Sequence, residues 1–404
     1  MSKNASTRLL NGDAWDDFCD TLKVAGRMLE KFPHDPSDLD RAEWYRYLTR
    51  LARNGFERFV ENCEPERPRL RDAPWRQSIN VQCPDQDHLL CEFVNGEHEY
   101  RIRGNRGSLP YFVMAAWSAP QPDDLGARNW AERGVAGLSE FDPTNLTTTA
   151  FLKSDDIDFD ENGDFEVIVS RQTRDGNWLA LRDDSVGVLV RTVHHDRASE
   201  TPPTMRIERL DAPAPRPLTP DDVSAGLAKA GQVVLGYAEQ VRDWWANKLP
   251  AESNRIVFSE ATYLSNGGVL DRLHGFGRWQ KSAEDALVVQ FTPPECEYWI
   301  LQLCNLWHEN LDVYEDGQGY VTKFNARYDS GGSILAVIAD TDPGVGGNWI
   351  DSFAHTNGIF SLRLIKPTDA PLVTIHCVPL ARLRTEGFAC LEDSEAILSG
   401  ELTS

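Results

Sequence analysis

The amino-acid sequence predicts a mainly β protein made of two tandem jelly-roll or β-sandwich domains, with an N-terminal pair of helices and one long linking helix. Short apolar segments separated by Asn-Gly and Asp-Gly turns fill two long stretches of the chain, a pattern typical of sandwiches and jelly rolls. Helical spacing is confined to the N-terminus and to the segment between these stretches. A Gly-Asn-Trp triplet, followed by an arginine in a strand, occurs once in each stretch, which favours two related domains.

The N-terminal region holds the two predicted helices. The first has an apolar stripe at i, i+3 and i+4 spacing, formed by Trp15, Phe18, Leu22, Ala25 and Leu29. The second begins at Ser37, because Asp40 three residues later completes a capping box, in which each side chain bonds to the other's backbone amide. The proline-rich run from Pro65 to Pro74 then ends helical structure, because proline lacks the N–H donor that a helix needs.

The linking helix begins at Thr219, which is followed by a proline at the first helical position and by Asp222 at the third. Its apolar spacing continues as far as Trp245. The predicted organisation is therefore 1–75 N-terminal helical region, 76–211 first β domain, 212–250 linking helix, 251–385 second β domain and 386–404 C-terminal tail.

The two β regions repeat one motif. The Gly-Asn-Trp triplets end at Trp178 and at Trp349, and each comes shortly after an apolar strand. Arg191 follows the first Trp by 13 residues, and Arg363 follows the second by 14. The shared order of strand, turn, triplet, strand and arginine predicts a diverged internal repeat.

The composition excludes several functional classes. The formal net charge is −22, which repels nucleic-acid phosphates and anionic membrane surfaces, so we expect neither a nucleic-acid nor a membrane partner. The chain shows no window of 18 apolar residues and no secretory signal, so we expect a cytoplasmic protein. The eight cysteines form no Cys-x-x-Cys pair, which favours free thiols in a reducing compartment.

We expect no cofactor and no transition metal. The sequence contains no Gly-x-Ser-x-Gly elbow, no phosphate-binding loop and no dinucleotide-binding glycine pattern. His194 and His195 are adjacent, and neighbouring side chains of a strand point to opposite faces, so they cannot share one ion.

Calcium binding stays open. The acidic segment from Asp158 to Gly163 matches the first half of an EF-hand loop, but Val169 stands where the bidentate Glu is needed. A hairpin turn is the favoured alternative, because Asn-Gly is a common hairpin connection.

Asp340 and Asp342 are the candidate catalytic residues. They follow the apolar run 334–339, and on an alternating strand both carboxylates face the same side. Such a pair could supply a proton donor and a proton acceptor. The alternative, favoured for Asp342, is a turn in which its side chain accepts hydrogen bonds from backbone amides.

The candidate substrate-binding residues are aromatic or cationic: Trp349, Arg363, Tyr298, Trp178 and Arg191. A Trp face binds a sugar ring or another flat ligand, but a Trp that recurs in a repeat is more simply a core residue whose indole N–H caps a carbonyl. The two arginines could clamp an anion bidentately. The favoured alternative is that each is half-buried and paired with a nearby acid.

These residues resemble the bacterial domain-of-unknown-function 1214 family. The C-terminal match is Glu297-Tyr298-Trp299, Ile338 to Gly344, Asn348-Trp349-Ile350-Asp351, Gly358 and Arg363. The N-terminal match is Cys83-Pro84-Asp85, Tyr100 to Gly107 and Gly176-Asn177-Trp178-Leu179. Family members show Asn-Pro-Asp with a Tyr shortly after, whereas here Cys83 replaces the Asn, and Leu89 or Leu90 stands where the Tyr is expected.

The resemblance covers the chain from about Trp15 to Leu383. It implies tandem jelly rolls similar to those of peptide:N-glycosidase F, an amidase that acts on Asn-linked glycans. A shared fold does not carry chemistry with it, so the resemblance implies little about the reaction.

The leading expectation is a cofactor-independent enzyme, a hydrolase of a glycan or glycoconjugate, with a Trp-lined acidic groove between the two β domains. Asp340 would be its acid or base, and Trp349 its stacking platform. The second expectation is a cytoplasmic binder or enzyme of a small hydrophobic or aromatic metabolite, such as a terpenoid, a steroid or an aromatic catabolite. A purely structural role is the third, and homo-oligomer formation is left open.

Overall fold

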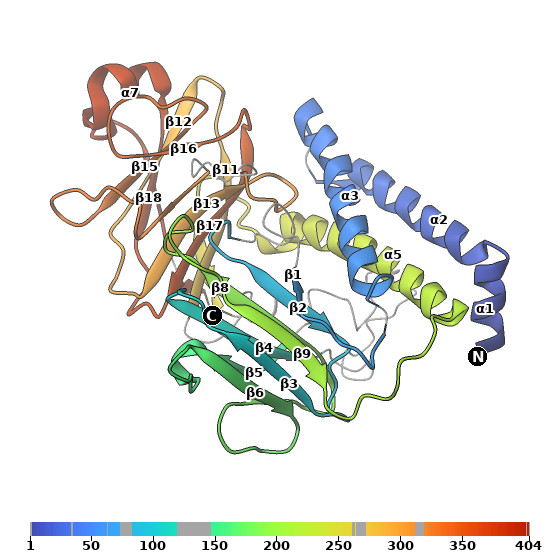
Figure 1. Ribbon diagram of the computed structural model, residues 1–404. Coiled ribbons are helices and arrows are strands. Elements are labelled where there is room, and N and C mark those ends of the chain that lie inside the picture. The colour runs from blue at the N-terminus through green and yellow to red at the C-terminus, as the bar shows by residue number, and fades with distance from the viewer. Residues whose placement is uncertain are drawn as a thin grey trace.

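The chain folds into two β-sandwiches and a layer of helices (Figure 1). The computed structural model describes residues 2–33, 35–62, 64–72, 83–118, 147–260, 263, 272–311, 319–400 and 402–403. The mainly β architecture with a helical N-terminal region is confirmed. The expected boundary at 75–76 and Cys63 lie outside the described residues.

Four helices lie side by side and form the helical layer. They are α1 (Ser2–Leu10), α2 (Asp13–Arg27), α3 (Asp38–Phe59) and α5 (Pro220–Asp243). A fifth, α7 (Leu380–Glu386), packs on the second sandwich. The predicted capping box at Ser37 is present, and the predicted N-cap Thr219 also forms a capping box with Asp222. The N-terminal region holds one more helix than expected, because a turn at residues 11–12 separates α1 from α2.

The first sandwich consists of two packed sheets. Its interface sheet has the order β1 (Arg71–Asp72), β2 (His88–Glu92), β8 (Ser185–Val193), β4 (Tyr111–Ser118) and β5 (Thr147–Lys153). Its outer sheet has the order β7 (Trp178–Ala180), β6 (Asp164–Ser170), β3 (Tyr100–Asn105) and β9 (Thr204–Arg209). Apolar side chains from both sheets form the core between them.

The second sandwich has the same plan. Its interface sheet has the order β14 (Tyr320–Thr322), β13 (Tyr298–Cys304), β17 (Asn357–Ile365), β11 (Arg272–Gln280), β10 (Val257–Ser259) and β20 (Leu402–Thr403). Its outer sheet has the order β16 (Asn348–Asp351), β15 (Ile334–Ala339), β12 (Asp285–Phe291), β18 (Val373–Pro379) and β19 (Ala396–Ser399). β19 and β20 lie in the segment expected as a tail, so the end of the chain is part of this sandwich.

Strands β1 to β9 and β10 to β18 pair in one and the same scheme. Each member of the first series has its counterpart nine strands later, with the same neighbours in the same relative directions. Each sandwich also contains an equivalent parallel pair, β6 with β7 and β15 with β16, and the second sandwich adds the parallel pair β10 with β20. The internal repeat that the sequence predicts therefore spans nine strands.

The Asn of each Gly-Asn-Trp triplet performs the same structural task in both halves. Asn177 accepts a hydrogen bond from the backbone N–H of Asp158 at 2.8 Å and donates to its carbonyl at 2.9 Å. Asn348 does the same with Arg327, at 2.6 and 2.9 Å. The preceding glycines have φ of 77° and 75°, a left-handed conformation that favours glycine. The triplet thus ties a distant loop to the parallel strand pair.

The two interface sheets meet face to face. Their contact is a cluster of seven buried residues, Cys83, Tyr111, Val113, Val193, Tyr298, Ile300 and Ile365. Helices α2, α3 and α5 pack against both sheets beside this contact, through side chains such as Trp44, Trp117 and Phe276. Every residue of β4 and of β13 is buried, because these strands carry a sandwich core on one face and the interface or the helices on the other.

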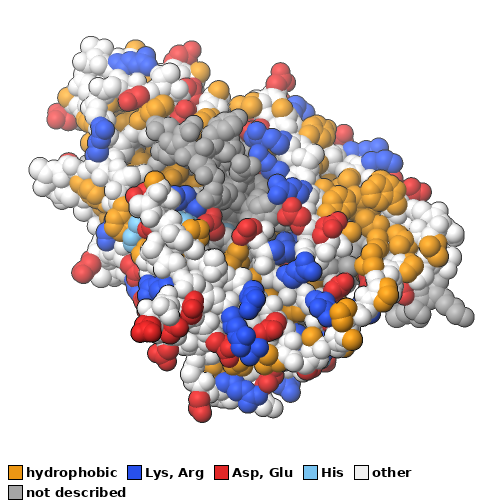
Figure 2. Space-filling model, in the orientation of Figure 1, with side chains coloured by type: hydrophobic (Ala, Val, Ile, Leu, Met, Phe, Trp, Pro, Cys, Tyr) orange, Lys and Arg blue, Asp and Glu red, His pale blue; other side chains and the backbone are white. Residues whose placement is uncertain are grey.

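Charged groups of both signs are mixed on the face shown in Figure 2, while hydrophobic side chains gather over the helical layer at the right of the view. Large exposed hydrophobic residues of α1 and α2 include Leu10, Trp15 and Val24. No helix of the described residues has the length and apolarity needed to cross a membrane.

A buried polar network joins α3 to the second sandwich. Glu43 of α3 accepts a hydrogen bond from Asn305 at 2.8 Å and lies 2.9 Å from Nε2 of His355, whose Nδ1 lies 3.0 Å from the carbonyl oxygen of Ser352. Burial opposes the charged form of both partners, but their hydrogen bond and charges prevail, so the pKa of Glu43 is lowered and that of His355 is raised. Folding therefore favours the charged form of both groups.

We predict that this pair makes stability depend on pH. The pKa of His355 is raised on folding, so the charged ring contributes to the free energy of unfolding. This contribution is fully present below about pH 6.5, the pKa of an unfolded histidine, and is lost as the pH rises through the raised pKa of the folded state. Glu43→Gln should lower the free energy of unfolding by about 1–3 kcal/mol near pH 6 and by less near pH 9. Urea unfolding at the two pH values, with the more exposed Glu57→Gln as control, checks this. An equal loss at both values contradicts it.

We predict a second stability effect where α3 crosses α5. A Cβ added to Gly55 would lie 2.9 Å from Cα of Ala230, in a contact that the backbone cannot relieve easily. Gly55→Ala should therefore cost about 1–3 kcal/mol. A Cβ added to Gly26 meets only Tyr45, at 3.9 Å, so Gly26→Ala should gain about 0.5–1 kcal/mol of helix propensity. Denaturant unfolding of both variants measures the contrast, and equal stabilities would refute it.

Candidate functional site

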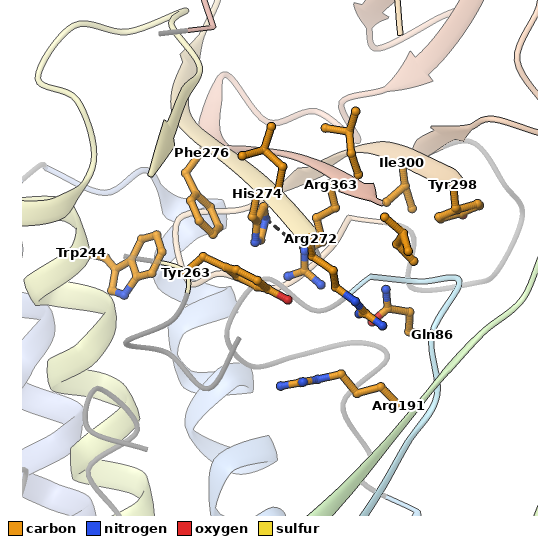
Figure 3. A pocket seen from close by; sticks show the side chains of 13 residues that line it. Gln86, Arg191, Trp244, Tyr263, Arg272, His274, Phe276, Tyr298, Ile300 and Arg363 are labelled. Carbon is orange, nitrogen blue, oxygen red and sulfur yellow. Dashed lines mark hydrogen bonds between the residues drawn. The ribbon is translucent and has the colours of Figure 1, made fainter. Parts of the chain in front are cut away.

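The candidate site is a pocket between the second interface sheet, the first interface sheet and the end of α5 (Figure 3). Its cavity volume, counted as the space open to the centre of a water molecule, is about 60 Å³. The lining residues are Gln86, Arg191, Trp244, Tyr263, Arg272, Leu273, His274, Phe276, Tyr298, Ile300, Arg363, Leu364 and Ile365. Ligand pockets commonly form where two domains meet.

Three guanidinium groups converge on this pocket. Arg191 comes from β8 of the first sandwich, whereas Arg272 and Arg363 come from β11 and β17 of the second (Figure 3). The strand registers place His88 directly opposite Arg191 and His274 directly opposite Arg363. The repeat therefore places an arginine opposite a histidine in both halves; both arginines line the pocket, and of the two histidines His274 does.

His274 orients Arg363. Nε of Arg363 donates to Nε2 of His274 at 3.0 Å, and the hydroxyl of Ser361 lies 2.7 Å from the same nitrogen. Burial, and then the charge of Arg363, hold the pKa of His274 well below its usual range. The ring is therefore neutral and accepts the hydrogen bond, which fixes one edge of the guanidinium group.

Burial also acts on the first-sandwich pair. It lowers the pKa of Arg191 to about 10, with Tyr263 opposing this shift and the charges of Arg272 and Arg363 adding to it. Burial and the neighbouring arginines likewise lower the pKa of His88 well below its usual range. Both histidines are neutral, so the guanidinium groups carry the positive charge of the pocket.

A buried acidic residue, Asp85, lies next to the lining of the pocket. Asp85 is buried beside Tyr298, and burial raises the pKa of both groups. The same segment is anchored by Asp87, which pairs with Arg197 through two bonds of 3.1 Å and lies 2.8 Å from Nε2 of His194. These bonds hold residues 84–88 against the pocket.

Aromatic side chains line the other side. Trp244 lies on a π-helical turn, Trp244–Lys248, that ends α5, and its ring packs edge-on against Phe276 at 4.7 Å. Tyr263 packs edge-on against His274 at 5.8 Å. The pocket therefore combines bidentate donors, which suit a carboxylate or phosphate group, with flat apolar surface, which suits an aromatic or aliphatic body.

The structure brings together only part of the predicted site. Arg191, Arg363 and Tyr298 line one pocket, as a shared groove between the domains requires. The four remaining residues, Asp340, Asp342, Trp349 and Trp178, do not line it. They lie in or beside the outer sheets, one layer away from the interface. Alternation along a strand predicts which side chains share a face, but not which sheet lies at the interface.

The Asp340 carboxylate is occupied by structural contacts. Its Oδ1 accepts hydrogen bonds from the hydroxyl of Ser352 and from the N–H of Ala354, and its Oδ2 lies 3.5 Å from Nζ of Lys281, whose side chain is fully buried. Asp342 is exposed and accepts from the N–H of Gly344 at 2.9 Å, which is the turn that the alternative interpretation describes.

The two motif Trp residues cap carbonyls, as their favoured alternative states. The indole of Trp178 donates to Ser170 at 3.1 Å, and that of Trp349 donates to Ala339 at 2.8 Å. Trp349 also borders a separate polar hollow that includes Asp342.

In the acidic loop, the carboxylate of Asp160 accepts hydrogen bonds from two backbone amides, as in a hairpin turn. Among the described residues, no group of three His, Cys, Asp or Glu side chains could hold a metal ion.

Sequence reasoning did not select Gln86, Arg272, His274, Tyr263 or Trp244 as site residues. One signal for the first three was present: Asp-x-x-His occurs at 85–88 and again at 271–274. Aligning the two repeats on this motif as well as on the triplets would have paired each histidine with its arginine. No comparable signal marks Tyr263 or Trp244.

We predict that Asp340 is needed for stability. Asp340→Asn removes the charge opposite buried Lys281, so the free energy of unfolding should fall by about 1–3 kcal/mol. Asp342→Asn keeps the turn, because Asn makes the same side-chain bond, and should change stability by less than about 0.5 kcal/mol. Thermal unfolding of both variants checks this. Unchanged melting of Asp340→Asn, together with lost turnover of a glycan, would instead support the catalytic assignment.

Comparison with known proteins defines the family. No family model and no curated protein matches the chain. The VPA0106 protein of Vibrio parahaemolyticus, 10% identical over 81% of this chain and 97% of its own, has a TM-score of 0.43, too low to carry an argument. An uncharacterized protein from Burkholderia cenocepacia is 30% identical, with a TM-score of 0.83, over 94% of this chain and 100% of its own. The chain belongs to the family of this Burkholderia protein.

Proposed function

We propose that the pocket between the two sandwiches binds a small organic acid with an aromatic or apolar body, either as a binding protein or as an enzyme. The observation that carries this proposal is the convergence of Arg191, Arg272 and Arg363 beside an aromatic wall. It develops the second expectation from the sequence, a small hydrophobic or aromatic metabolite, by adding a negative charge to the ligand.

The half-buried position of these arginines strengthens their attraction for an anion. A carboxylate that enters such a site exchanges water for guanidinium donors in surroundings of low dielectric constant, where opposite charges attract far more strongly than in water. Hydrogen bonds to charged groups contribute about 1.5–3 kcal/mol each. The aromatic side chains Trp244, Phe276 and Tyr263 offer the rest of the ligand a surface that favours rings.

The hydrolase hypothesis has weaker support. It needs Asp340 as an acid or base, whereas this carboxylate is bound by Lys281, Ser352 and Ala354. The polar hollow beside Trp349 and Asp342 is where a sugar would have to bind. Membership of the domain-of-unknown-function 1214 family, a cytoplasmic location and the absence of nucleic-acid and membrane partners stay predictions from the sequence.

We predict selective binding of an aromatic carboxylate. 4-Hydroxybenzoate should bind in calorimetry, whereas its uncharged isostere 4-hydroxybenzamide should bind at least about tenfold more weakly, a difference of about 1.4 kcal/mol. Arg363→Gln should lose most of that difference, because it removes one charge from the pocket.

Arg103→Gln is the matched control. Arg103 lies on an outer sheet, outside the pocket, and is paired with Glu166 at 2.8 Å, so its replacement should leave the binding of 4-hydroxybenzoate unchanged. Equal affinity of the folded wild-type protein for the acid and the amide, or no binding of either, would overturn the proposal.

A further inference from the structure

The strand registers match pocket residues of the two halves one by one. Arg191 and Arg363 correspond, because each is opposite the histidine of its neighbouring strand. Two residues before each histidine stand Gln86 and Arg272. Arg272 lies opposite Ile365 in the second sandwich. In the first sandwich, the N–H of residue 194 donates to the carbonyl of residue 85, and the N–H of residue 192 donates to the carbonyl of residue 87. These bonds continue the register of β2 with β8, so Gln86 lies opposite Val193. Gln86 and Arg272 are therefore equivalent positions.

Of the two pairs of equivalent positions in the pocket, one carries the same residue type in both halves and the other does not. Both members of each pair line the pocket, the two arginines from β8 and β17, and Gln86 with Arg272. Of these four, Gln86 alone is uncharged. The second-sandwich side of the pocket thus presents two guanidinium groups, whereas the first-sandwich side presents one guanidinium group and one amide.

Arg272 is held in place from across the interface. Its guanidinium carbon lies 5.5 Å from the ring centroid of Tyr111, a residue of β4 in the first sandwich. A cation over an aromatic face is attracted by the ring's quadrupole. The two sandwiches together therefore fix the position of the charge that breaks the symmetry.

We infer that the pair Gln86 and Arg272 sets the orientation and the charge of the ligand. This inference rests on the proposed function. The anionic group lies toward the second sandwich, between Arg272 and Arg363, and an uncharged hydrogen-bonding group faces the Gln86 amide, which both donates and accepts. The substrate class is therefore an aromatic monocarboxylate with a neutral polar substituent, such as a hydroxyl, rather than a dicarboxylate, because the first-sandwich side presents one guanidinium group where the second presents two.

A charge swap across the two halves tests this. Arg272→Gln should weaken the binding of 4-hydroxybenzoate by ten- to a hundredfold. Gln86→Arg should raise the affinity for terephthalate, a dicarboxylate, at least tenfold relative to 4-hydroxybenzoate. The double variant Gln86→Arg/Arg272→Gln should bind 4-hydroxybenzoate within about threefold of the wild-type protein, because it moves the charge to the equivalent position.

The outcomes separate the two proposals. Suppose that the wild-type protein prefers 4-hydroxybenzoate over its amide. The inference is then overturned, and the proposed function is kept, if Arg272→Gln changes the affinity less than twofold or if the double variant binds no better than Arg272→Gln. A wild-type protein without that preference overturns both. If Arg272→Gln does not fold, as judged by circular dichroism and melting, Gln86→Arg decides by its terephthalate preference: an unchanged preference contradicts the inference.

Discussion

The meeting of the two interface sheets is the contact on which the rest of the structure depends. β4 and β13 are buried along their whole length because they serve a sandwich core on one face and the interface or the helices on the other. Two-sided burial requires a nearly continuous apolar sequence. Burying polar side chains between these facing sheets costs free energy unless they are hydrogen-bonded. The interface nevertheless contains arginines and histidines, such as Arg363 bonded to His274. Their presence indicates that this part of the interface has a role other than packing.

One duplicated motif thus contains residues of two kinds. The Asn and Trp of each triplet bond to their own sandwich, so Asn177 and Asn348 stabilise two copies of the same loop independently. The arginines point the other way, toward the partner sandwich. Because the copies face each other, Arg191 and Arg363 reach one common pocket. Recurrence in a repeat argues for a structural role only where the repeated side chain stays inside its own copy.

The sequence alone predicts the mainly β architecture, the starts of α3 and α5 and the repeat, because these depend on local chemistry: the N-caps Ser37 and Thr219, turn dipeptides and alternation. It predicts three of the pocket residues through the repeat and through the family motif. It could not separate them from Asp340 and Trp349, because the choice of the sheet that faces the interface is a tertiary property. The repeat did not identify Arg272 as a pocket residue, because the equivalent position of the first half is Gln86, which carries no charge.

The long reach of the α3 contacts has a consequence for synthesis. Asn305 stands 262 positions after Glu43 in the chain, and His355 stands 312 positions after it. A chain that leaves the ribosome from its N-terminus presents α3 long before either partner exists, and its carboxylate stays hydrated meanwhile. These contacts between α3 and the second sandwich can therefore form only after most of that sandwich has emerged. During that interval the apolar residues of the first interface sheet that contact the second sandwich, Tyr111, Val113 and Val193, lack their cover, so translation speed and chaperone access bear directly on the yield of folded protein.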